Sequence, residues 1–402
     1  MKIQGYIRPD GKVGIRNHLL IVSTGRNSAN LALLIANNIA GAKVFTPPNN
    51  EAGRGSEDRE TIARTIVGLG KNPNVGAVLI VGIKPDGGYL EFSYENIVGE
   101  IRKTGKPVET VFLVEHGGLY PSVGEGIRLG RELAVKASET LRQEVDFGSL
   151  FVGIKCGYSD PTSGIAGNTA AGNFADRLVD AGGSFIFSET TEVIGAEHIL
   201  ARRFTEENER RKFLTAVARV EADAKSLGED IRSINPIPAN IAGGITTLEE
   251  KSLGAIAKAG TKPMQQCVRY AEQIARPGLH FMDSWMSSSA LFLGFATSGT
   301  VLNILQIGGN WMPEGALMPA ANTGIVTPLL VMTGNPVFYD RAPSELDFNA
   351  GSIISEGESV DGAGERLVEL VQHIASGRLT KAETMGTHEP VELYMRNAVF
   401  NS

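Results

Sequence analysis

The sequence predicts an α/β protein built from two Rossmann-like or flavodoxin-like units, each a parallel sheet with helices on both faces. Short apolar runs alternate with segments of helical spacing, and this pattern starts again near residue 149. The 402 residues are enough for two or three domains with separate cores. We therefore expect an N-terminal α/β domain over residues 1–148. A C-terminal α/β domain over residues 149–402 is expected to hold most of the polar strand ends.

The predicted elements of the first domain alternate between strand and helix, which favours a parallel sheet because parallel strands need crossover helices. The run HLLIVS is the first strand, and an N-cap signal at Ser56 opens a helix with acidic residues in its first turn. The expected strands are 18–23, 76–81 and 108–114, and the expected helices are 28–40, 56–68, 95–103 and 122–145.

The second domain begins with the apolar run SLFVGIK, and its later elements are less regular. A capping-box match, Thr247 with Glu250, opens one helix, and residues 230–244 are expected to form a long surface loop because of their prolines and glycines. The expected strands are 149–155, 184–188, 278–283, 300–306 and 317–322, and the expected helices are 165–181, 205–227, 248–259 and 361–376.

Composition and charge exclude several classes of protein. With 38 Lys and Arg against 45 Asp and Glu, the net charge of −7 gives no general attraction to nucleic acid or to an anionic membrane. No apolar run is long enough for a membrane span, and the N-terminal residues lack the apolar core of a secretory signal, so a cytoplasmic protein is expected. The two cysteines, Cys156 and Cys267, are expected to be reduced thiols.

Two glycine turns with a basic residue follow predicted elements of the first domain. Arg26 lies in TGRNS, directly before a helix, and Arg54 lies in GRGS. A helix N-terminus can bind an anion, which a neighbouring arginine would reinforce, although an ordinary strand-to-helix turn explains the same pattern. Neither turn matches a nucleotide fingerprint, which disfavours nicotinamide or ATP chemistry.

The segment KCGYSDPTSG, at residues 155–164, is the densest polar strand end of the chain. Lys155 is a candidate general base or a clamp for a substrate carboxylate, with Asp160, Ser163 and Asn168 orienting the substrate. The alternative is structural: Asp160 and Ser163 would cap the next helix, and Cys156 would be a small buried apolar side chain.

A group of acidic residues follows the next predicted strand. Glu189, Glu192, Glu197 and His198 are candidate ligands of a divalent cation such as Mg, Mn or Fe(II), although solvent-facing carboxylates explain them equally well. Asp283 follows a third predicted strand, so we expect its carboxylate at the same sheet edge, where it would contact substrate.

Several motifs in order resemble the altronate/galactarate dehydratase family, over residues 5 to about 388. They include GYIRPDGKVGIRNHLLIV, IKCGYSDPTSGIAGN, SETTEVIGAEHIL, NIAGGITTLEEKSLGAIAK and GLHFMD. The resemblance implies a lyase that removes water from a hydroxylated sugar acid with a divalent metal, iron or manganese. It also implies a separate small subunit and an oligomer, because the small N-terminal domain of full-length members is missing here.

Two segments depart from the family pattern. PNNEAGRGSED stands where a His-x-x-Gly-Cys motif is expected, and VGIKPD stands where Gly-Cys-Glu is expected. Both segments, and FMDSWMSSSALF, are closer to the large subunit of sulfolactate sulfo-lyase. The sequence therefore leaves three functions open, namely dehydration of a 2-hydroxy carboxylate, sulfite release from sulfolactate, and non-catalytic binding of a sugar acid.

Our hypothesis is that the protein catalyses β-elimination from a small anionic hydroxy acid. Charge that builds on the substrate carboxylate must be stabilised by a cation while a base removes the neighbouring proton. Arg16, Arg26 and Arg54 are the candidate anion contacts, and no nucleic-acid or membrane partner is expected.

Overall fold

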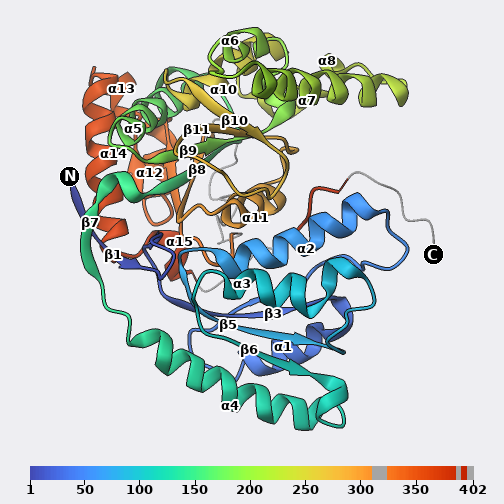
Figure 1. Ribbon diagram of the computed structural model, residues 1–402. Helices are drawn as coiled ribbons and strands as arrows, with labels where there is room; N and C mark the ends of the chain where they lie inside the picture. The colour runs from blue at the N-terminus through green and yellow to red at the C-terminus, as the bar shows by residue number, and fades with distance from the viewer. Residues whose placement is uncertain (310–323, 386–390, 396–402) are drawn as a thin grey trace.

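Two parallel sheets form the framework of the protein, as a computed structural model that describes residues 1–309, 324–385 and 391–395. The first sheet has four strands in the order β4-β3-β5-β6, and the second has seven in the order β10-β11-β9-β8-β12-β13-β14. Every neighbouring pair in both sheets is parallel. The predicted α/β class with parallel-sheet units is confirmed (Figure 1).

The four-stranded sheet is covered on both faces, so its strands are continuously apolar. One face packs against α1 and α4, and the other against α2 and α3. The bounds are β3 (His18–Ser23), α1 (Ala29–Ala36), β4 (Lys43–Phe45), α2 (Ser56–Lys71), β5 (Val75–Gly82), α3 (Glu100–Arg102), β6 (Val108–Phe112) and α4 (Leu119–Ser138).

The seven-stranded sheet has α5 and α14 packed together on one side, and α11 contacts β8 and β12. Its strands are β8 (Phe151–Gly157), β9 (Ser184–Phe187), β10 (Met264–Val268), β11 (Gly278–Met282), β12 (Leu302–Ile307), β13 (Leu329–Thr333) and β14 (Phe348–Asn349). Its longer helices are α5 (Asn168–Asp180), α7 (Glu207–Ser226), α10 (Leu248–Ile256), α11 (Ser288–Ser298) and α14 (Val360–Ala375). The shorter ones are α6 (Glu197–Ala201), α8 (Ile231–Ile234), α9 (Pro238–Ala242), α12 (Pro336–Arg341), α13 (Ser352–Ser355) and α15 (Lys381–Thr384).

A small antiparallel sheet joins the two units. Its strands are β1 (Lys2–Ile7), β2 (Val13–Gly14) and β7 (Gln143–Asp146), in the order β2-β1-β7, and β1 also contacts α14 of the second unit. This sheet corrects one prediction. The helix expected over 122–145 ends at Ser138, because the segment from Gln143 pairs with β1 instead of continuing the helix.

Three further expectations concern a loop, a strand and a helix cap of the second unit, and each has a different outcome. The predicted loop 230–244 contains the short helices α8 and α9, where Asp230 and Pro238 provide ordinary helix-start residues. The expected strand 317–322 lies outside the described residues. The capping box at Thr247 is confirmed in part, since its hydroxyl accepts a hydrogen bond from Glu250 N at 3.1 Å.

The two units share a hydrophobic core, because α11 of the second unit packs on α2 of the first. Two buried asparagines before β5 add polar bonds across the same boundary. The Asn72 amide donates to the carbonyl oxygens of Ala296 and Thr300 at 2.7 and 2.9 Å. The Asn74 amide donates to those of Val301 and Val326 at 2.8 and 3.0 Å. We call this pair the asparagine latch.

Within the described part of the chain, no helix combines the length and the apolar character that crossing a membrane requires.

Candidate functional site

The strand order of the second sheet reverses at β8, which has β9 on one side and β12 on the other. In open parallel sheets, ligands bind outside the carboxyl ends of strands at such a switch point. Lys155 and Cys156 lie at this end of β8, and Cys156 is in register with Gln306 of β12. The fold therefore puts the predicted polar turn where a ligand is expected.

Five charged side chains, all nearly inaccessible to solvent, form a cluster behind this turn. They are Lys155, Lys251, Lys258, Glu189 and Glu192, and we call them the lysine–glutamate cluster. Lys258 pairs with Glu189 and, at 3.3 Å, with Glu192. Lys155 lies 3.1 Å from Glu189, and Lys251 lies 3.3 Å from Glu192. Three cations face two carboxylates, so the cluster has an excess positive charge.

The pKa values in the cluster follow from burial and from these pairs. Burial acts to lower the pKa of Lys155, but the carboxylates of Glu189 and Glu192 outweigh it and raise the pKa above its ordinary value. The same balance raises the pKa of Lys258. Lys155 is therefore protonated at neutral pH. This charge state disfavours the predicted role of general base. The Lys155 ammonium group donates to the Cys156 carbonyl oxygen at 2.8 Å and supplies positive charge behind the turn.

The two carboxylates of the cluster respond in opposite directions. Burial and the neighbouring Glu192 raise the pKa of Glu189. Burial also acts to raise the pKa of Glu192, but the three surrounding lysines outweigh it and lower that pKa. Glu189 is also held in the left-handed region, at φ 78°, which is rare for a residue with a side chain. Such strained backbone is concentrated at functional sites.

A cavity of about 240 Å³ opens beside the cluster, and we call it the strand-end cavity. Lys251 lines it and thereby connects it to the cluster. Asn168 also lines it, and the buried Oδ1 of Asn168 has no hydrogen-bond partner, whereas its amide donates to Gly254 O at 2.9 Å. An unsatisfied buried acceptor at a cavity wall is a ready contact for a ligand donor. The other polar side chains of the wall belong to Cys156, Ser159, Asp160, Ser163 and Glu250.

Two residues of the predicted turn, Asp160 and Ser163, line this cavity and have hydrogen-bond partners of their own. Asp160 accepts hydrogen bonds from Thr162 N at 2.9 Å and from the Asn335 amide at 3.4 Å. The Ser163 hydroxyl lies 3.3 Å from Asp160 N and accepts from it. The same bonds fit the structural alternative, in which Asp160 and Ser163 cap the next helix. The geometry is therefore compatible with both a structural and a substrate-orienting role for these two side chains.

Cys156 is a protonated thiol. Burial, followed by the charge of Glu192, raises its pKa. Its sulfur donates to Gln306 Oε1 at 3.0 Å and lies 3.1 Å from the Ser159 hydroxyl. Both cysteines are buried and free.

The structure separates the four predicted metal ligands. Glu189 and Glu192 belong to the cluster and are occupied by lysines, whereas Glu197 accepts a hydrogen bond from Gly195 N at 2.5 Å and His198 is exposed on α6. Among the described residues, no group of three or more His, Cys, Asp or Glu side chains is arranged to hold a metal ion. A divalent cation does not fit these four residues, because ammonium groups already neutralise the two buried carboxylates.

Asp283 lies at a second, larger hollow of about 460 Å³. Its carboxylate accepts a bidentate pair from Arg219 of α7, at 2.7 and 2.9 Å, and a hydrogen bond from the Thr190 hydroxyl at 2.9 Å. Residues of α2 and α7 and the carboxyl ends of β10 and β11 line this hollow, so we call it the interdomain cavity. Asp283 and the strand-end residues therefore line different cavities.

The three arginines predicted to bind anions lie apart from one another. Arg16 is buried and held by Glu383 at 2.7 Å and by the carbonyl oxygens of Ile374 and Arg378. Arg54 pairs with Asp58 at 3.3 Å in the first turn of α2, beside the interdomain cavity. Arg26 is exposed. None of the three lines the strand-end cavity.

Sequence reasoning missed Lys251 and Lys258. Both lie in the segment predicted as an ordinary amphipathic helix, about 100 residues beyond the turn they serve. Their spacing of seven residues puts both on one helix face, together with the buried Leu248 and Ala255. Two lysines on the otherwise apolar face of a predicted helix were the sequence signal that could have identified these buried charges.

Two parallel-sheet units, with a buried charge cluster and a polar cavity at a strand-order switch point, are typical of α/β enzymes. The profile of the D-galactarate/altronate dehydratase C-terminal domain matches residues 147–398, and that of the second domain of D-galactarate dehydratase/altronate hydrolase matches residues 5–138. The chain therefore belongs to the galactarate/altronate dehydratase family, and it is an enzyme of the lyase class.

Named relatives include enzymes with different leaving groups. The chain is 34% identical to the (2R)-sulfolactate sulfo-lyase subunit beta of Chromohalobacter salexigens, over 96% of this chain and 95% of that protein. It is 27% identical to the altronate dehydratase of Bacillus subtilis, over 94% of this chain and 75% of that protein. It is also 27% identical to the galactarate dehydratase (L-threo-forming) of Escherichia coli, over 82% of this chain and 62% of that protein.

Proposed function

We propose that this protein eliminates water from a small 2-hydroxy carboxylate, such as a sugar acid, to give a 2-keto acid in the strand-end cavity. The observation that supports this most is the lysine–glutamate cluster beside a cavity with an unsatisfied Asn168 acceptor. In a β-elimination, negative charge grows on the substrate carboxylate as the neighbouring carbon loses its proton. Buried, fixed cations stabilise such charge far better than water does.

In this proposal each side chain of the cavity has one role. Lys251 binds the substrate carboxylate, and Lys155 and Lys258 hold the positive potential behind it. Asp160 is the buried carboxylate of the wall and accepts the proton from the carbon next to the carboxylate. Asn168 and Ser163 orient the substrate hydroxyl groups. The hydroxyl group on C3 leaves, takes up the proton that Asp160 accepted from C2, and departs as water. The enol formed between C2 and C3 then becomes the 2-keto acid.

Sulfite release from sulfolactate is the second candidate. Its support is the 34% identity to a sulfo-lyase subunit beta over nearly the full length of both chains. Sulfite is already a stable anion, so its departure needs cationic surroundings more than a proton donor. A non-catalytic sugar-acid-binding subunit is the third candidate, and it predicts binding without turnover.

A divalent metal, Fe(II) or Mn(II), and a separate small subunit are also part of the proposal. The relative named as a subunit beta supports a partner chain. The metal requirement rests on the family resemblance, and no step above is assigned to a metal. Chelation with EDTA, followed by addition of Fe(II) or Mn(II), is expected to abolish and then restore turnover.

The test is an anaerobic assay of the purified chain with altronate, galactarate and sulfolactate, with and without the small subunit. Keto acid without sulfite supports the dehydratase, and sulfite supports the second candidate. Binding without product from any of the three, with the small subunit and either metal present, would reject both lyase proposals.

A matched pair of variants tests the cavity. We expect Lys251→Met to lower kcat by about 10²- to 10³-fold, as loss of one preorganised donor does in other enzymes. Lys103→Met removes an exposed lysine of the first unit and should leave kcat unchanged. Equal activity of both variants would rule out the strand-end cavity as the reaction site.

A further inference from the structure

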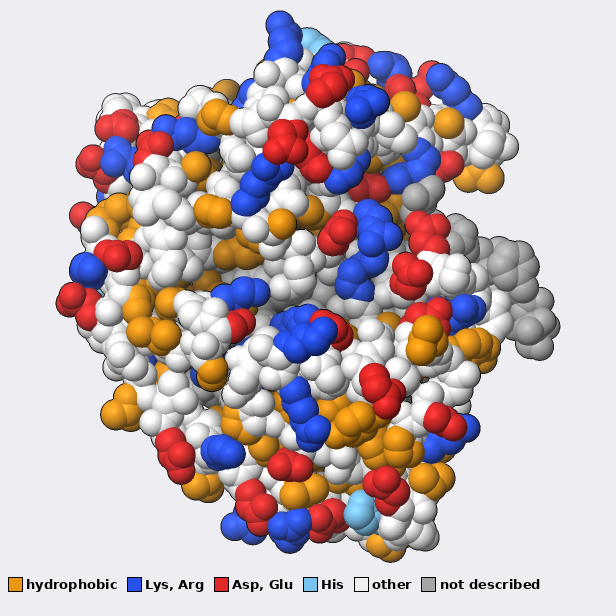
Figure 2. All heavy atoms as spheres, viewed as in Figure 1, with side chains coloured by type: hydrophobic (Ala, Val, Ile, Leu, Met, Phe, Trp, Pro, Cys, Tyr) orange, Lys and Arg blue, Asp and Glu red, His pale blue; other side chains and the backbone are white. Residues whose placement is uncertain are grey.

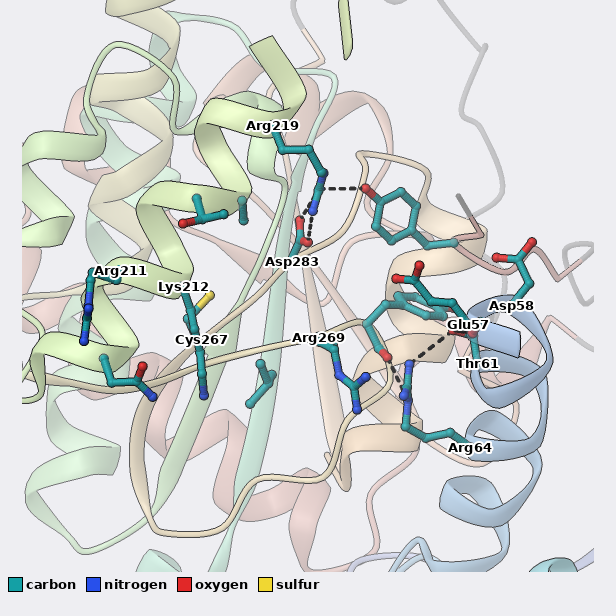
Figure 3. A pocket seen from close by; sticks show the side chains of 16 residues that line it. Glu57, Asp58, Thr61, Arg64, Arg211, Lys212, Arg219, Cys267, Arg269 and Asp283 are labelled. Carbon is teal, nitrogen blue, oxygen red and sulfur yellow. Dashed lines mark hydrogen bonds and ion pairs between the residues drawn. The ribbon is translucent and has the colours of Figure 1, made fainter. Parts of the chain in front are cut away.

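The interdomain cavity is rich in cations that the proposed reaction does not use. Its wall contains five basic side chains and three carboxylates, an excess of two positive charges in a chain whose net charge is −7. Figure 3 shows the basic groups on two sides, with Arg211 and Lys212 on α7 and Arg64 and Arg269 across the cavity. In the space-filling view, Lys and Arg side chains gather along the hollow between the two halves of the molecule (Figure 2).

Arg64 and Arg269 bring two like charges from different units together, and Arg269 also makes a solvent-exposed pair with Glu272 at 3.5 Å. Arg64 belongs to α2 and Arg269 follows β10, and their guanidinium groups point toward one another (Figure 3). Arg64 donates to Tyr270 O and to the Thr61 hydroxyl, each at 3.2 Å, and within the described chain it has no carboxylate partner. Burial and then the charge of Arg269 lower the pKa of Arg64. An anion between the two guanidinium groups would remove this repulsion.

The opposite side of the cavity also has free positive charge. Arg211 makes no ion pair or hydrogen bond with any residue that the structure describes, and Lys212 pairs with Glu209 at 2.7 Å. Arg219, between the two sides, is fixed by Asp283 and by the Tyr394 hydroxyl at 3.0 Å. The cavity thus has two separated cationic ends with a rigid, neutralised pair between them.

We propose that the interdomain cavity binds a small organic dianion, with one anionic group between Arg64 and Arg269 and the other at Arg211. Arginine suits both ends, because its planar fork of donors binds carboxylate, sulfonate or phosphate oxygens in pairs. The volume of about 460 Å³, nearly twice that of the strand-end cavity, accommodates a ligand that spans both ends. The site is separate from the strand-end cavity and does not rest on the proposed function.

The test is calorimetric titration of the full chain at constant ionic strength with acetate, succinate, glutarate, adipate and inorganic phosphate. We expect at least one dicarboxylate to bind and to raise the melting temperature, because a ligand that binds only the folded state stabilises it. Acetate should bind much more weakly. Phosphate is a compact dianion, so tighter binding of phosphate than of every dicarboxylate would overturn the two-ended site.

Variants locate the binding. Arg269→Gln and Arg211→Gln should each weaken dicarboxylate binding about 10-fold or more, the effect of losing one charge-assisted contact. Lys225→Gln removes an exposed charge from the same helix as Arg211 but outside the cavity, so it should bind like the parent. Melting of each variant without ligand controls for misfolding, since neither Arg211 nor Arg269 is buried.

A variant of the strand-end cavity separates this proposal from the proposed function. Lys251→Met should retain full dicarboxylate binding even if it abolishes turnover. Loss of binding in Lys251→Met with retention in Arg211→Gln and Arg269→Gln would assign the dianion to the strand-end cavity and overturn the inference. The absence of binding by every dicarboxylate would overturn it as well.

Discussion

At the scale of single residues, the lysine–glutamate cluster decides the chemistry near β8. A lone buried ion would be too costly to desolvate, and in the cluster each ammonium group has a carboxylate within 3.3 Å that offsets this cost. Lys155 contacts Glu189 and the Cys156 carbonyl oxygen, and Lys251 contacts Glu192 and lines the strand-end cavity. The cluster therefore couples the stability of the fold to the electrostatic potential in that cavity. Changes in the cluster should therefore affect both.

Lys258→Met tests this coupling. Removing Lys258 takes away the ammonium group that pairs with both Glu189 and Glu192 and leaves one lysine for each buried carboxylate. We therefore expect a destabilisation of about 3–5 kcal/mol, measured by urea unfolding. Glu189→Gln in the Lys258→Met background should recover part of the loss, since it removes a buried carboxylate that has lost one of its two ammonium partners. Strictly additive effects of the two substitutions would show that their charges do not interact. Lys103→Met is the exposed control and should change stability little.

The residues of the site differ in how far the sequence could predict them. Lys155, Asp160, Ser163 and Asn168 lie within fourteen consecutive residues, so one strand-end rule identifies them together. Lys251 reaches the cavity only because α10 packs beside the turn of residues 163–167, a tertiary contact that periodicity does not encode. Lys251 of α10 and Lys258, just beyond it, pair with Glu189 and Glu192, which is why these carboxylates do not fit the predicted role of metal ligands.

At the scale of elements, glycines set how closely helices approach. A Cβ on Gly68 of α2 would lie 2.3 Å from Thr297 Cγ2 and 2.6 Å from Thr297 O on α11. This contact unites the cores of the two units, and only a residue without a side chain permits it.

Gly68→Ala should therefore destabilise the protein by about 1–3 kcal/mol, because α2 and α11 must move apart. Gly124→Ala is the matched control on α4, where an added Cβ meets nothing within 4 Å. That change should be neutral or stabilising by up to about 1 kcal/mol, since alanine has the higher helix propensity. Thermal melting of both variants is the measurement, and equal melting temperatures would contradict the packing argument.

The elements themselves were predictable where periodicity is local. The strands 18–23 and 76–81 match β3 and β5 closely, because a strand buried on both faces is continuously apolar. In contrast, β1 and β7 are short and acquire their conformation from pairing with each other across 140 residues. The pattern of residues in a short stretch of sequence does not reveal pairing between strands so far apart.

At the scale of the whole molecule, two histidines should make the stability sensitive to acid, because burial lowers the pKa of His18 to about 3 and that of His280 to about 4. His280 lies on β11, the second strand from one edge of the seven-stranded sheet, with no exposed surface, and neither ring nitrogen has a hydrogen-bond partner. Burial, reinforced by Arg276, lowers its pKa to about 4. In the unfolded chain a histidine titrates near ~6.5. Between these values the unfolded state binds the proton and the folded state does not, so stability falls as the pH falls.

His280→Phe should remove the part of this sensitivity that His280 contributes, while His18 keeps its own part. The ring lies edge-on to Phe151, with centroids 6.3 Å apart, so an apolar ring is compatible with the site. The parent should lose about 3 kcal/mol more than His280→Phe between pH 6.5 and pH 4. Urea midpoints of both proteins across that range measure the difference. His198→Gln, at an exposed position, is the control, and a parallel pH dependence of parent and His280→Phe would refute the assignment.

The asparagine latch has a consequence for the time course of binding. Four amide–carbonyl bonds, inaccessible to solvent, cross from the segment before β5 to the second unit, and rocking the units apart would break them without access to water. We therefore expect no slow hinge motion of the two units during ligand binding. A ligand of the interdomain cavity should enter a preformed space, so that in stopped-flow traces the observed rate rises linearly with ligand concentration and reaches no plateau.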